Sequence, residues 1–421
     1  MTPLNLLIII SAIILISFIV EQLLAMLNNS RMSDPIPDLL RDVYEEDRYR
    51  KSQDYHQANH VFSLLKDTLS TLLILAMLWL GGFAWIDSIV GNYTGNAIWQ
   101  GLFFFGLLGL ASSLLSLPFD IYHTFIIEEK FGFNRTTPGT FIKDLLKGWF
   151  LAILLGGGML AGIIALYLAT GPNFWLIAWV MVTVFMLLLT YFYSSVIVPL
   201  FNKQTPLAQG PLREEIEAFA MKTNFNLSGI FVIDGSKRST KANAYFSGFG
   251  RRKRIVLFDT LILDHTTEEL VAVLAHEIGH NKYRHTLKGM VAGIIQTGVM
   301  LGLFSLIANN PLLSEALGAA SPGFHLALMA FALLYSPVSQ VTGLITNIYS
   351  RKHEYQADAF AANNYGATYL ITALKKLSKS NLSNLTPHPA YVFVNYSHPP
   401  LLNRLEALIK MNGLRHITKK E

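Results

Sequence analysis

Seven long apolar runs constrain the fold of this chain more than any other feature of its sequence. They are Leu4–Leu27, Phe62–Val90, Asn96–Phe119, Trp149–Ala169, Phe174–Phe201, Met290–Ala308 and Phe324–Ser350. A hydrocarbon core of about 30 Å is crossed by about 20 apolar residues of helix, so each run predicts one membrane span. Composition agrees, because 14% of the residues are charged, whereas about a quarter are charged in soluble domains.

The positions of the basic residues support seven spans and give an orientation. The turns at residues 91–95, 171–173 and 309–323 contain no Lys or Arg, and all 33 basic residues lie in the other loops or, for Lys66, near the start of the second run. Lys and Arg accumulate on the cytoplasmic side. We therefore expect a multi-pass protein of an inner cell membrane (or of the ER membrane in a eukaryote), with its N-terminus outside and its C-terminus in the cytoplasm. The bilayer is an expected partner, and nucleic acid is not, because the net charge is only +5.

A short stretch on the cytoplasmic side carries a metal-binding pattern. His276 and His280 are four residues apart, and Glu277 follows the first. Positions i and i+4 share one face of a helix, so both imidazoles can bind one metal ion, and the glutamate can take a proton from a metal-bound water. The chain has no cysteine, so any further ligand must be His, Asp or Glu. The plain alternative is an amphipathic helix whose histidines only cap or fill.

A catalytic zinc usually has three protein ligands and a water. In one ligand pattern, the third ligand is a histidine six residues after the second. This position is Thr286 here, so the pattern is absent; His285 is one residue too early and is expected on the helix surface. Glu315 lies on the opposite side of the membrane in the predicted topology. Glu354 lies on the same side as the histidines and is the better candidate, and Asp358, one turn later, can hydrogen-bond the far nitrogen of a bound imidazole. Taken alone, residues 354–358 are equally compatible with an ordinary surface helix.

A tetrahedral intermediate also needs groups that stabilise its oxyanion. His398 lies just before a predicted helix and Arg404 about one turn into it, so both are candidates. Without further context, a proline-initiated helix with a solvated arginine is the favoured interpretation of this stretch.

The polar segments predict a mainly α fold with a small β-sheet. We expect residues 1–201 to form a membrane domain of five spans and residues 202–421 to form a second domain, which carries the metal motif and includes the spans at 290–308 and 324–350. In this second part we expect strands at Gly229–Ile233, Asn243–Phe246 and Arg254–Phe258, a glycine-rich turn at 248–250, a capping box at Thr266–Glu269, and helices at Pro211–Lys222, Ala367–Lys379 and Pro400–Met411.

Together these motifs resemble those of the CAAX prenyl protease type 1 family, which are integral-membrane, gluzincin-type metalloendopeptidases. Two further stretches, Glu128–Thr137 and Asp234–Phe246, are similar to the same family. The resemblance covers nearly the whole chain, and the short loops without long eukaryotic insertions suggest a bacterial member.

The resemblance implies seven helices that form a barrel around a large, partly water-filled chamber, closed at the cytoplasmic end by the zinc domain. It implies one Zn²⁺ per chain bound by His276, His280 and Glu354, with Glu277 activating the water. It further implies that Asp358 supports a ligand histidine or donates a proton, that His398 and Arg404 stabilise the transition state, and that the strand at Asn243, Ala244 and Tyr245 pairs with the substrate backbone.

Polar side chains at membrane depth give the chamber some support of their own, because such groups usually face a bundle interior or water. They are Lys66, Asp67, Gln100, Gln296, Gln340 and Asn347. For Lys66 and Asp67 the alternative is an interfacial pair that extends toward the headgroups.

We therefore expect an integral-membrane zinc endopeptidase that acts on a peptide or protein substrate. The family implies removal of the C-terminal tripeptide of prenylated CAAX proteins. Most bacteria are not expected to make prenylated proteins, so turnover of non-prenylated membrane proteins is the alternative. Topology alone also fits a seven-helix transporter or receptor, which leaves the metal motifs unexplained. A binding protein with an inactive site would lack a ligand or the base, and all of them are present.

Overall fold

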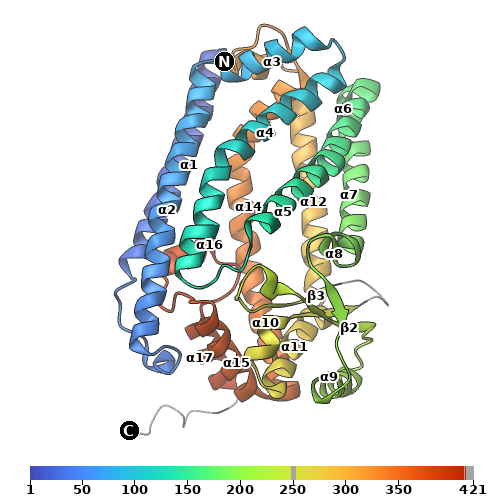
Figure 1. Cartoon of the computed structure of the whole chain (residues 1–421). Coiled ribbons are helices and arrows are strands. Elements are labelled where there is room, and N and C mark those ends of the chain that lie inside the picture. Colours follow the sequence, from blue (N-terminus) through green and yellow to red (C-terminus); the bar gives the residue numbers. More distant parts are fainter. Residues whose placement is uncertain (248–252, 412, 414–421) are drawn as a thin grey trace.

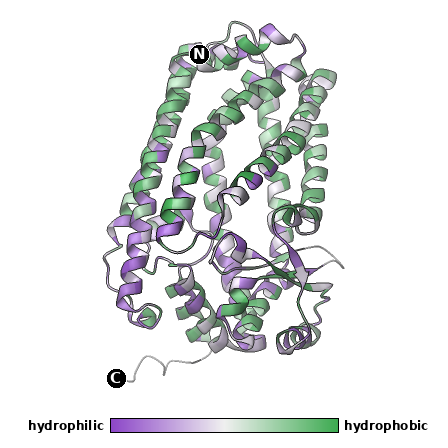
Figure 2. Cartoon of the chain, viewed as in Figure 1, coloured by the Kyte–Doolittle hydropathy of each residue, from purple (hydrophilic) through white to green (hydrophobic). Residues whose placement is uncertain are grey.

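The membrane part is a ring of long helices that stand side by side above a polar α/β part (Figure 1). The computed structural model describes residues 1–247, 253–411 and 413. The long helices are α1 (Pro3–Ser30), α2 (Glu46–Trp79), α4 (Ala97–Tyr122), α5 (Pro138–Leu151), α6 (Gly158–Thr170), α7 (Phe174–Phe192), α12 (His285–Ile307) and α14 (Phe324–Ala361). Figure 2 shows that their upper parts are apolar and that the lower ends are hydrophilic. The prediction of a mainly helical, multi-pass membrane protein is confirmed.

Six helical stretches are long and apolar enough to cross a membrane among the described residues. One of them, Pro138–Phe201, reverses direction at Gly171–Asn173, where Gly171 has a φ of +57°. This stretch therefore crosses twice, as α5–α6 and as α7, which makes seven crossings as the apolar runs predict.

The membrane-spanning helices bury few of their residues inside the protein. In the most apolar 18-residue part of each stretch, only 6% to 22% of the residues are buried inside the protein. A helix in a packed bundle buries a whole face, so these helices leave most of their surface uncovered by the rest of the protein. Several polar side chains on them are bonded to neighbouring helices, such as Lys66 to Asp120 (3.3 Å), Gln22 to Asp67 (3.4 Å) and Gln296 to Thr342 (2.9 Å).

The second predicted span is wrong in its extent. Helix α2 ends at Trp79, and the residues up to Val90 belong to a separate helix, α3 (Gly82–Tyr93), which runs across the upper end of the ring (Figure 1). Gly81 adopts a φ of +69°, and a Cβ on Gly82 would lie 2.4 Å from the sulfur of Met77, so the two glycines end α2 and turn the chain. Apolar residues of α3 are buried in the cluster that closes this end, together with α13 (Pro311–Ala316).

The α/β part contains one four-stranded sheet in the order β1-β2-β4-β3. The strands are β1 (Gln204–Pro206), β2 (Gly229–Ile233), β3 (Ala244–Ser247) and β4 (Arg254–Phe258). Strands β2 and β4 are parallel, and the other pairs are antiparallel, so β3 is an edge strand. Three strands lie within one residue of their predicted places. The short β1 was not predicted, and the predicted turn at 248–250 lies outside the described residues.

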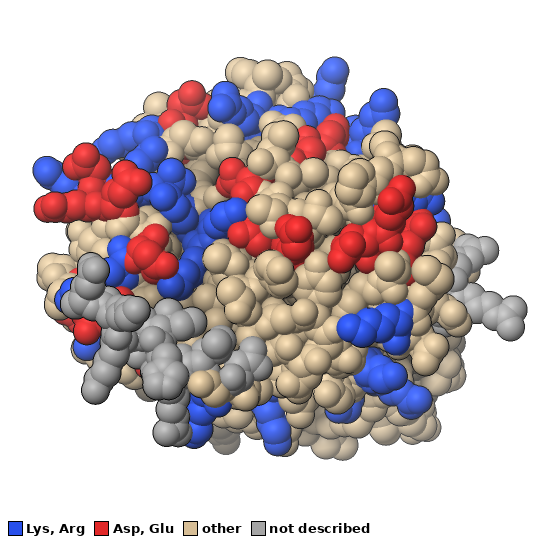
Figure 3. Space-filling model, turned by 90° about the horizontal axis from the view of Figure 1, so that it is seen from below, with Lys and Arg blue, Asp and Glu red and all other residues tan. Residues whose placement is uncertain are grey.

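The remaining α-helices belong to the α/β part or lie at its border with the membrane part. They are α8 (Val198–Phe201), α9 (Pro211–Lys222), α10 (Asp259–Asp264), α11 (Thr267–Lys282), α15 (Ala367–Ser380), α16 (Pro389–Asn395) and α17 (Leu401–Met411). The core joins apolar residues of the sheet, α9, α11, α15 and α17 to the lower end of α2. Seen from below, Lys and Arg are mixed with Asp and Glu over this end of the molecule, as expected for a surface in water (Figure 3).

Candidate metal centre

Helix α11 carries the predicted metal motif through the centre of the α/β core. It begins with a capping box in which Thr266 and Glu269 satisfy each other's backbone N–H groups. Residues 270–276 are all buried, so the helix has no solvated face in its middle. A polar imidazole buried there needs a partner, and the partners come from α14, which crosses α11 directly.

A glycine permits this crossing. A Cβ on Gly279 would lie 3.1 Å from the Cα of Ala357 and 3.1 Å from the Cβ of Phe360. These distances are tighter than ordinary contacts, so a residue larger than glycine would push α11 and α14 apart. The glycine inside the His276–His280 motif therefore allows Glu354, on α14, to reach the two histidines.

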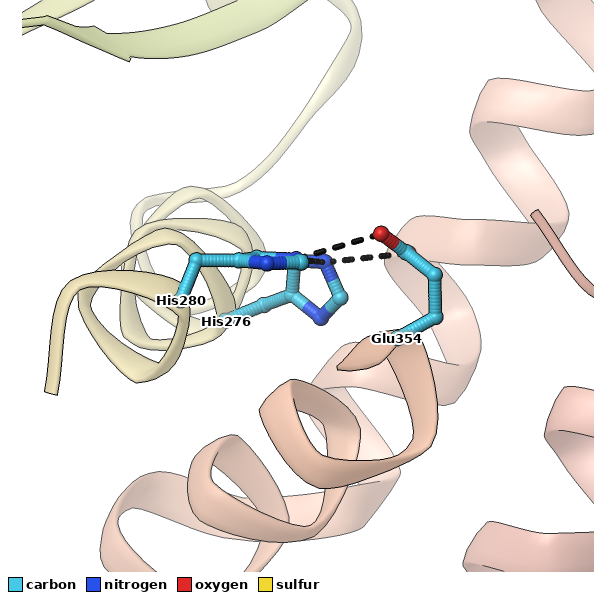
Figure 4. Close-up of side chains that lie close together, drawn as sticks. All are labelled: His276, His280 and Glu354. Carbon is cyan, nitrogen blue, oxygen red and sulfur yellow. Dashed lines mark hydrogen bonds and ion pairs between the residues drawn. The ribbon is translucent and has the colours of Figure 1, made fainter. Parts of the chain in front are cut away.

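Three side chains converge on one point from these two helices (Figure 4). The Nε2 atoms of His276 and His280 are 3.1 Å apart, and the Glu354 carboxylate oxygens lie 3.4 Å from the first and 3.2 Å from the second. A tetrahedral zinc ion with bonds of 2.0–2.1 Å would hold its ligands about 3.3 Å apart. The two histidines approach different oxygens of Glu354, and each of these separations is close to that spacing, so this triangle of side chains has room for one zinc ion.

The chemistry of the donor set also fits a cation. Glu354 Oε2 is buried without a hydrogen-bond donor, and two imidazole nitrogens face each other where only one of them can carry a proton. Buried lone pairs that converge in this way are costly unless a cation shares them. His276, His280 and Glu354 are the one group of metal-binding type found among the described residues.

Behind the triangle, Asp358 holds the first histidine. It is fully buried and accepts a hydrogen bond from Nδ1 of His276 at 2.8 Å. Arg404 donates to the same carboxylate from Nε at 2.8 Å and from Nη2 at 2.6 Å. Burial alone would lower the pKa of His276, but the Asp358 and Glu354 carboxylates outweigh burial and raise this pKa to about 9 in the metal-free protein. The carboxylate also fixes the His276 tautomer, so that Nε2 faces the triangle.

A cavity of about 120 Å³ lies in front of the triangle. Glu277, His398 and Arg404 line it together with His276 and Glu354. Burial raises the pKa of Glu277, which strengthens it as a proton acceptor. The structure therefore places Glu277, a carboxylate with a raised pKa, in the cavity beside His276 and Glu354.

His398 and Arg404 lie at the same cavity in different ways. The side chain of His398 is 64% exposed. Its Nδ1 shares a hydrogen bond of 2.9 Å with the hydroxyl of Ser397, and its Nε2 lies 3.4 Å from Oε1 of Glu354. Arg404 is only 11% exposed, and two of its three nitrogens are engaged by Asp358. Their assignment to oxyanion stabilisation stays a prediction, with His398 the freer group.

The edge strand β3 borders the cavity at its start, since Ala244 and the preceding residue Asn243 line it. Asn243 accepts from the backbone N–H of Phe258 at 3.1 Å. Backbone groups alternate along an antiparallel strand, so Asn243 and Tyr245 face β4 while Ala244 and Phe246 face the open edge. Of the three predicted substrate-binding residues, only Ala244 turns its backbone groups away from β4, and its N–H donates to Oδ1 of Asn243 at 2.8 Å. The Tyr245 side chain instead lines a second, larger cavity.

The two further stretches that were compared with the family contact each other beside this strand. Asn134 pairs with Ser239, Arg135 donates from its backbone to Arg238 at 3.0 Å, and Thr240 donates to Phe133 at 3.0 Å. Lys241 then binds Tyr55 and Glu128, both at 2.9 Å. These contacts hold in place the chain that leads into β3.

The prediction that His285 lies on the helix surface is wrong. Its exposure is only 5%. Arg284 has a φ of +57°, which ends α11 and redirects the chain, so α12 begins at His285 with its ring turned back toward His280. The two Nδ1 atoms are 3.0 Å apart. Sequence reasoning missed this contact because it extended one regular helix through residue 285.

Comparison with known proteins places the chain among membrane peptidases. A family model described as "CAAX prenyl protease N-terminal, five membrane helices" matches residues 25–203, and one for "Peptidase family M48" matches residues 206–412. The chain is 38% identical to a "CAAX prenyl protease 1 homolog" of Oryza sativa, with 89% of this chain and 90% of that protein covered. It is 34% identical to the Homo sapiens protein of the same name, with 89% of each covered. The crystal structure of S. mikatae Ste24p superposes with a TM-score of 0.91 at 34% identity, over 96% of this chain and 99% of that one.

Proposed function

We propose that zinc is the metal of this chain, held by His276, His280 and Glu354. The proposal starts from the family: the chain belongs to the CAAX prenyl protease 1 family within peptidase family M48 and is a membrane metalloendopeptidase. The observation that carries the proposal is the convergence of the two histidine Nε2 atoms and the Glu354 carboxylate, whose contacts are 3.1 to 3.4 Å long. A bound zinc would polarise the scissile carbonyl and acidify a water beside Glu277.

The residues around the triangle then have separate tasks. Glu277 takes the proton of the attacking water and returns it to the leaving amine. Asp358 holds His276 in the tautomer that presents Nε2, and Arg404 compensates the buried charge of Asp358. The backbone of Ala244 pairs with the peptide at the edge of β3, and His398 reaches the carbonyl oxygen from the far side of the cavity.

Metal analysis tests the ligand set. We expect one zinc per wild-type chain and a reduced zinc content after His280→Ala or Glu354→Gln. Glu277→Gln serves as the matched control, because it should keep its zinc while losing cleavage. A variant with a full zinc content would remove the replaced residue from the ligand set.

For the substrate, we propose a prenylated protein whose C-terminal residues are released. The related proteins are named CAAX prenyl proteases. A mostly apolar cavity of about 970 Å³ borders the edge strand at Tyr245 and Ser247, and pockets of about 300–1,000 Å³ bury drug-sized ligands. A farnesyl chain that continues from a peptide paired with β3 would find apolar surface there.

A comparison of two peptides tests this substrate class. The same peptide is offered with and without a farnesyl group on its cysteine, and cleavage is measured for wild type and Glu277→Gln. We expect a kcat/KM at least tenfold higher for the farnesylated peptide. Equal values would favour the alternative, a protease that degrades non-prenylated membrane proteins.

We further propose that the catalytic α/β part faces the cytoplasm, with residues 1–201 as the membrane domain and 202–421 as the protease domain. The turns at 91–95, 171–173 and 309–323, which lie at the opposite end, carry no Lys or Arg. The chain has no cysteine, so single cysteines can report orientation. In intact cells an impermeant maleimide should label Asn92→Cys and leave Glu214→Cys unlabelled; the reverse pattern would invert the orientation.

A further inference from the structure

The second zinc ligand has an unusual partner on the side that faces away from the metal triangle. His280 directs Nε2 to the triangle, which leaves its Nδ1 for a second contact. That Nδ1 lies 3.0 Å from Nδ1 of His285. Nε2 of His285 lies 2.9 Å from Oε1 of Gln356 on α14. The three residues thus form a chain of hydrogen bonds that starts at the metal site and ends at an amide.

From this chain we infer that His285 is a positioning residue for the ligand His280, with Gln356 fixing the His285 tautomer. The inference rests on the proposed function, since it takes His280 to be a ligand. It assigns to His285 the task that Asp358 performs for His276.

The protons have one consistent arrangement. An imidazole that binds metal through Nε2 keeps its hydrogen on Nδ1 and must donate it. The Nδ1 of His285 therefore accepts, which places the His285 hydrogen on Nε2. The amide oxygen of Gln356 accepts that hydrogen. Each bond requires the next, so removal of Gln356 would free His285 to adopt the wrong tautomer and lose the bond to His280.

The geometry excludes His285 as a ligand of the same ion. Its Nδ1 contacts the ring nitrogen of His280 that faces away from the triangle, and its Nε2 is engaged by Gln356. Its ring is held in place by stacking on His353, with ring centres 3.9 Å apart and planes 10° apart. Burial and stacking alone would also suit a histidine that merely fills the core, and the test must separate the two roles.

The two ligands are therefore supported unequally. His276 donates to the carboxylate Asp358, whereas His280 donates to a neutral imidazole. His285 is the first residue of α12 and Gln356 lies on α14. Both helices continue into the membrane part, so the orientation of His280 depends on how these two helices meet.

The test is the rate at which zinc leaves the purified full-length protein into an excess of chelator in detergent. His285→Ala removes the acceptor, and His285→Asn places an amide oxygen near the former Nδ1. His353→Ala is the matched control, because it removes the stacked ring without touching His280. Loss of an outer partner of a metal-bound histidine typically costs 10- to 100-fold in metal affinity. We expect zinc release at least tenfold faster for His285→Ala, and rates within about threefold of wild type for His285→Asn and His353→Ala.

Three outcomes would overturn the inference. One is wild-type zinc release from His285→Ala, and another is equal acceleration in His285→Asn, which would make His285 a packing residue. If His285→Ala fails to fold, two variants of Gln356 replace it in the test. Gln356→Met removes the acceptor for the Nε2–H of His285 and should accelerate zinc release, whereas Gln356→Glu keeps an acceptor and should not. Equal rates of zinc release from these two variants are the third outcome that overturns the inference. The proposed function fails separately, if the wild type holds no zinc or if His280→Ala keeps all of it.

Discussion

The pair formed by Asp358 and Arg404 allows a quantitative test of what holds the metal site in place. Asp358 is fully buried and accepts three hydrogen bonds, one from His276 and two from Arg404, at 2.6 to 2.8 Å. Asp358→Ala would leave a guanidinium that is only 11% exposed with one carboxylate oxygen, of Glu354, at 3.7 Å. Breaking a buried ion pair from one side costs about 3–5 kcal/mol.

This cost can be read as a shift in thermal unfolding of the metal-free protein, followed by intrinsic fluorescence in detergent. For a cooperative unit of about 200 residues, 1 kcal/mol corresponds to roughly 2–4 °C, so Asp358→Ala should lower Tm by roughly 6–20 °C. Zinc binding should also weaken by about 10- to 100-fold, because His276 loses the group that orients it.

A double-mutant cycle separates the lost charge pair from lost packing. Arg404→Met alone leaves the Asp358 carboxylate without its cation, and Asp358→Asn alone leaves the Arg404 guanidinium without its anion, whereas the two substitutions together remove both charges of the pair. If stranded charge dominates, the double variant should be more stable than the sum of its parts by about 3 kcal/mol. Additive shifts in Tm, or a wild-type Tm for Asp358→Ala, would refute the reasoning.

Three further changes have defined outcomes. Glu277→Gln should retain its zinc and lower kcat by about 10²–10⁴-fold, the usual contribution of a general base; full cleavage would show that another group takes the proton. Zinc binding must displace the proton that His276 carries below its pKa of about 9. The dissociation constant for zinc should therefore fall about tenfold per pH unit between pH 6 and 8 and become constant near pH 9. A dissociation constant that does not change with pH in equilibrium titrations would contradict this pKa. Gly279→Ala would place a Cβ 3.1 Å from the Cα of Ala357. It should therefore destabilise the fold by about 1–3 kcal/mol and accelerate zinc release. An unchanged Tm would show that α11 and α14 can move apart without loss of stability.

The sequence by itself determined those features that depend on local periodicity. Apolar runs of span length, turns free of Lys and Arg, and two histidines on one helical face are each encoded within a few turns of chain. For the same reason strands β2 and β4 and helix α9 lie where their residues predict them. A run of apolar residues indicates only that the run is buried or faces lipid. The sequence therefore could not show that the second apolar run continues beyond the end of α2 into α3, a separate helix across the top of the ring.

Only the tertiary structure decided which distant groups meet at the site. Asp358 reaches His276 from 82 positions away, because Gly279 lets two helices cross at close range. The turn at Arg284 brings His285 back to His280, against the expectation from a continuous helix. Such contacts depend on the packing of whole helices and on single backbone angles, neither of which leaves a periodic signal in the sequence. The motif therefore predicts a metal, and the crossing of α11 with α14 brings Glu354 and Asp358 to the two histidines.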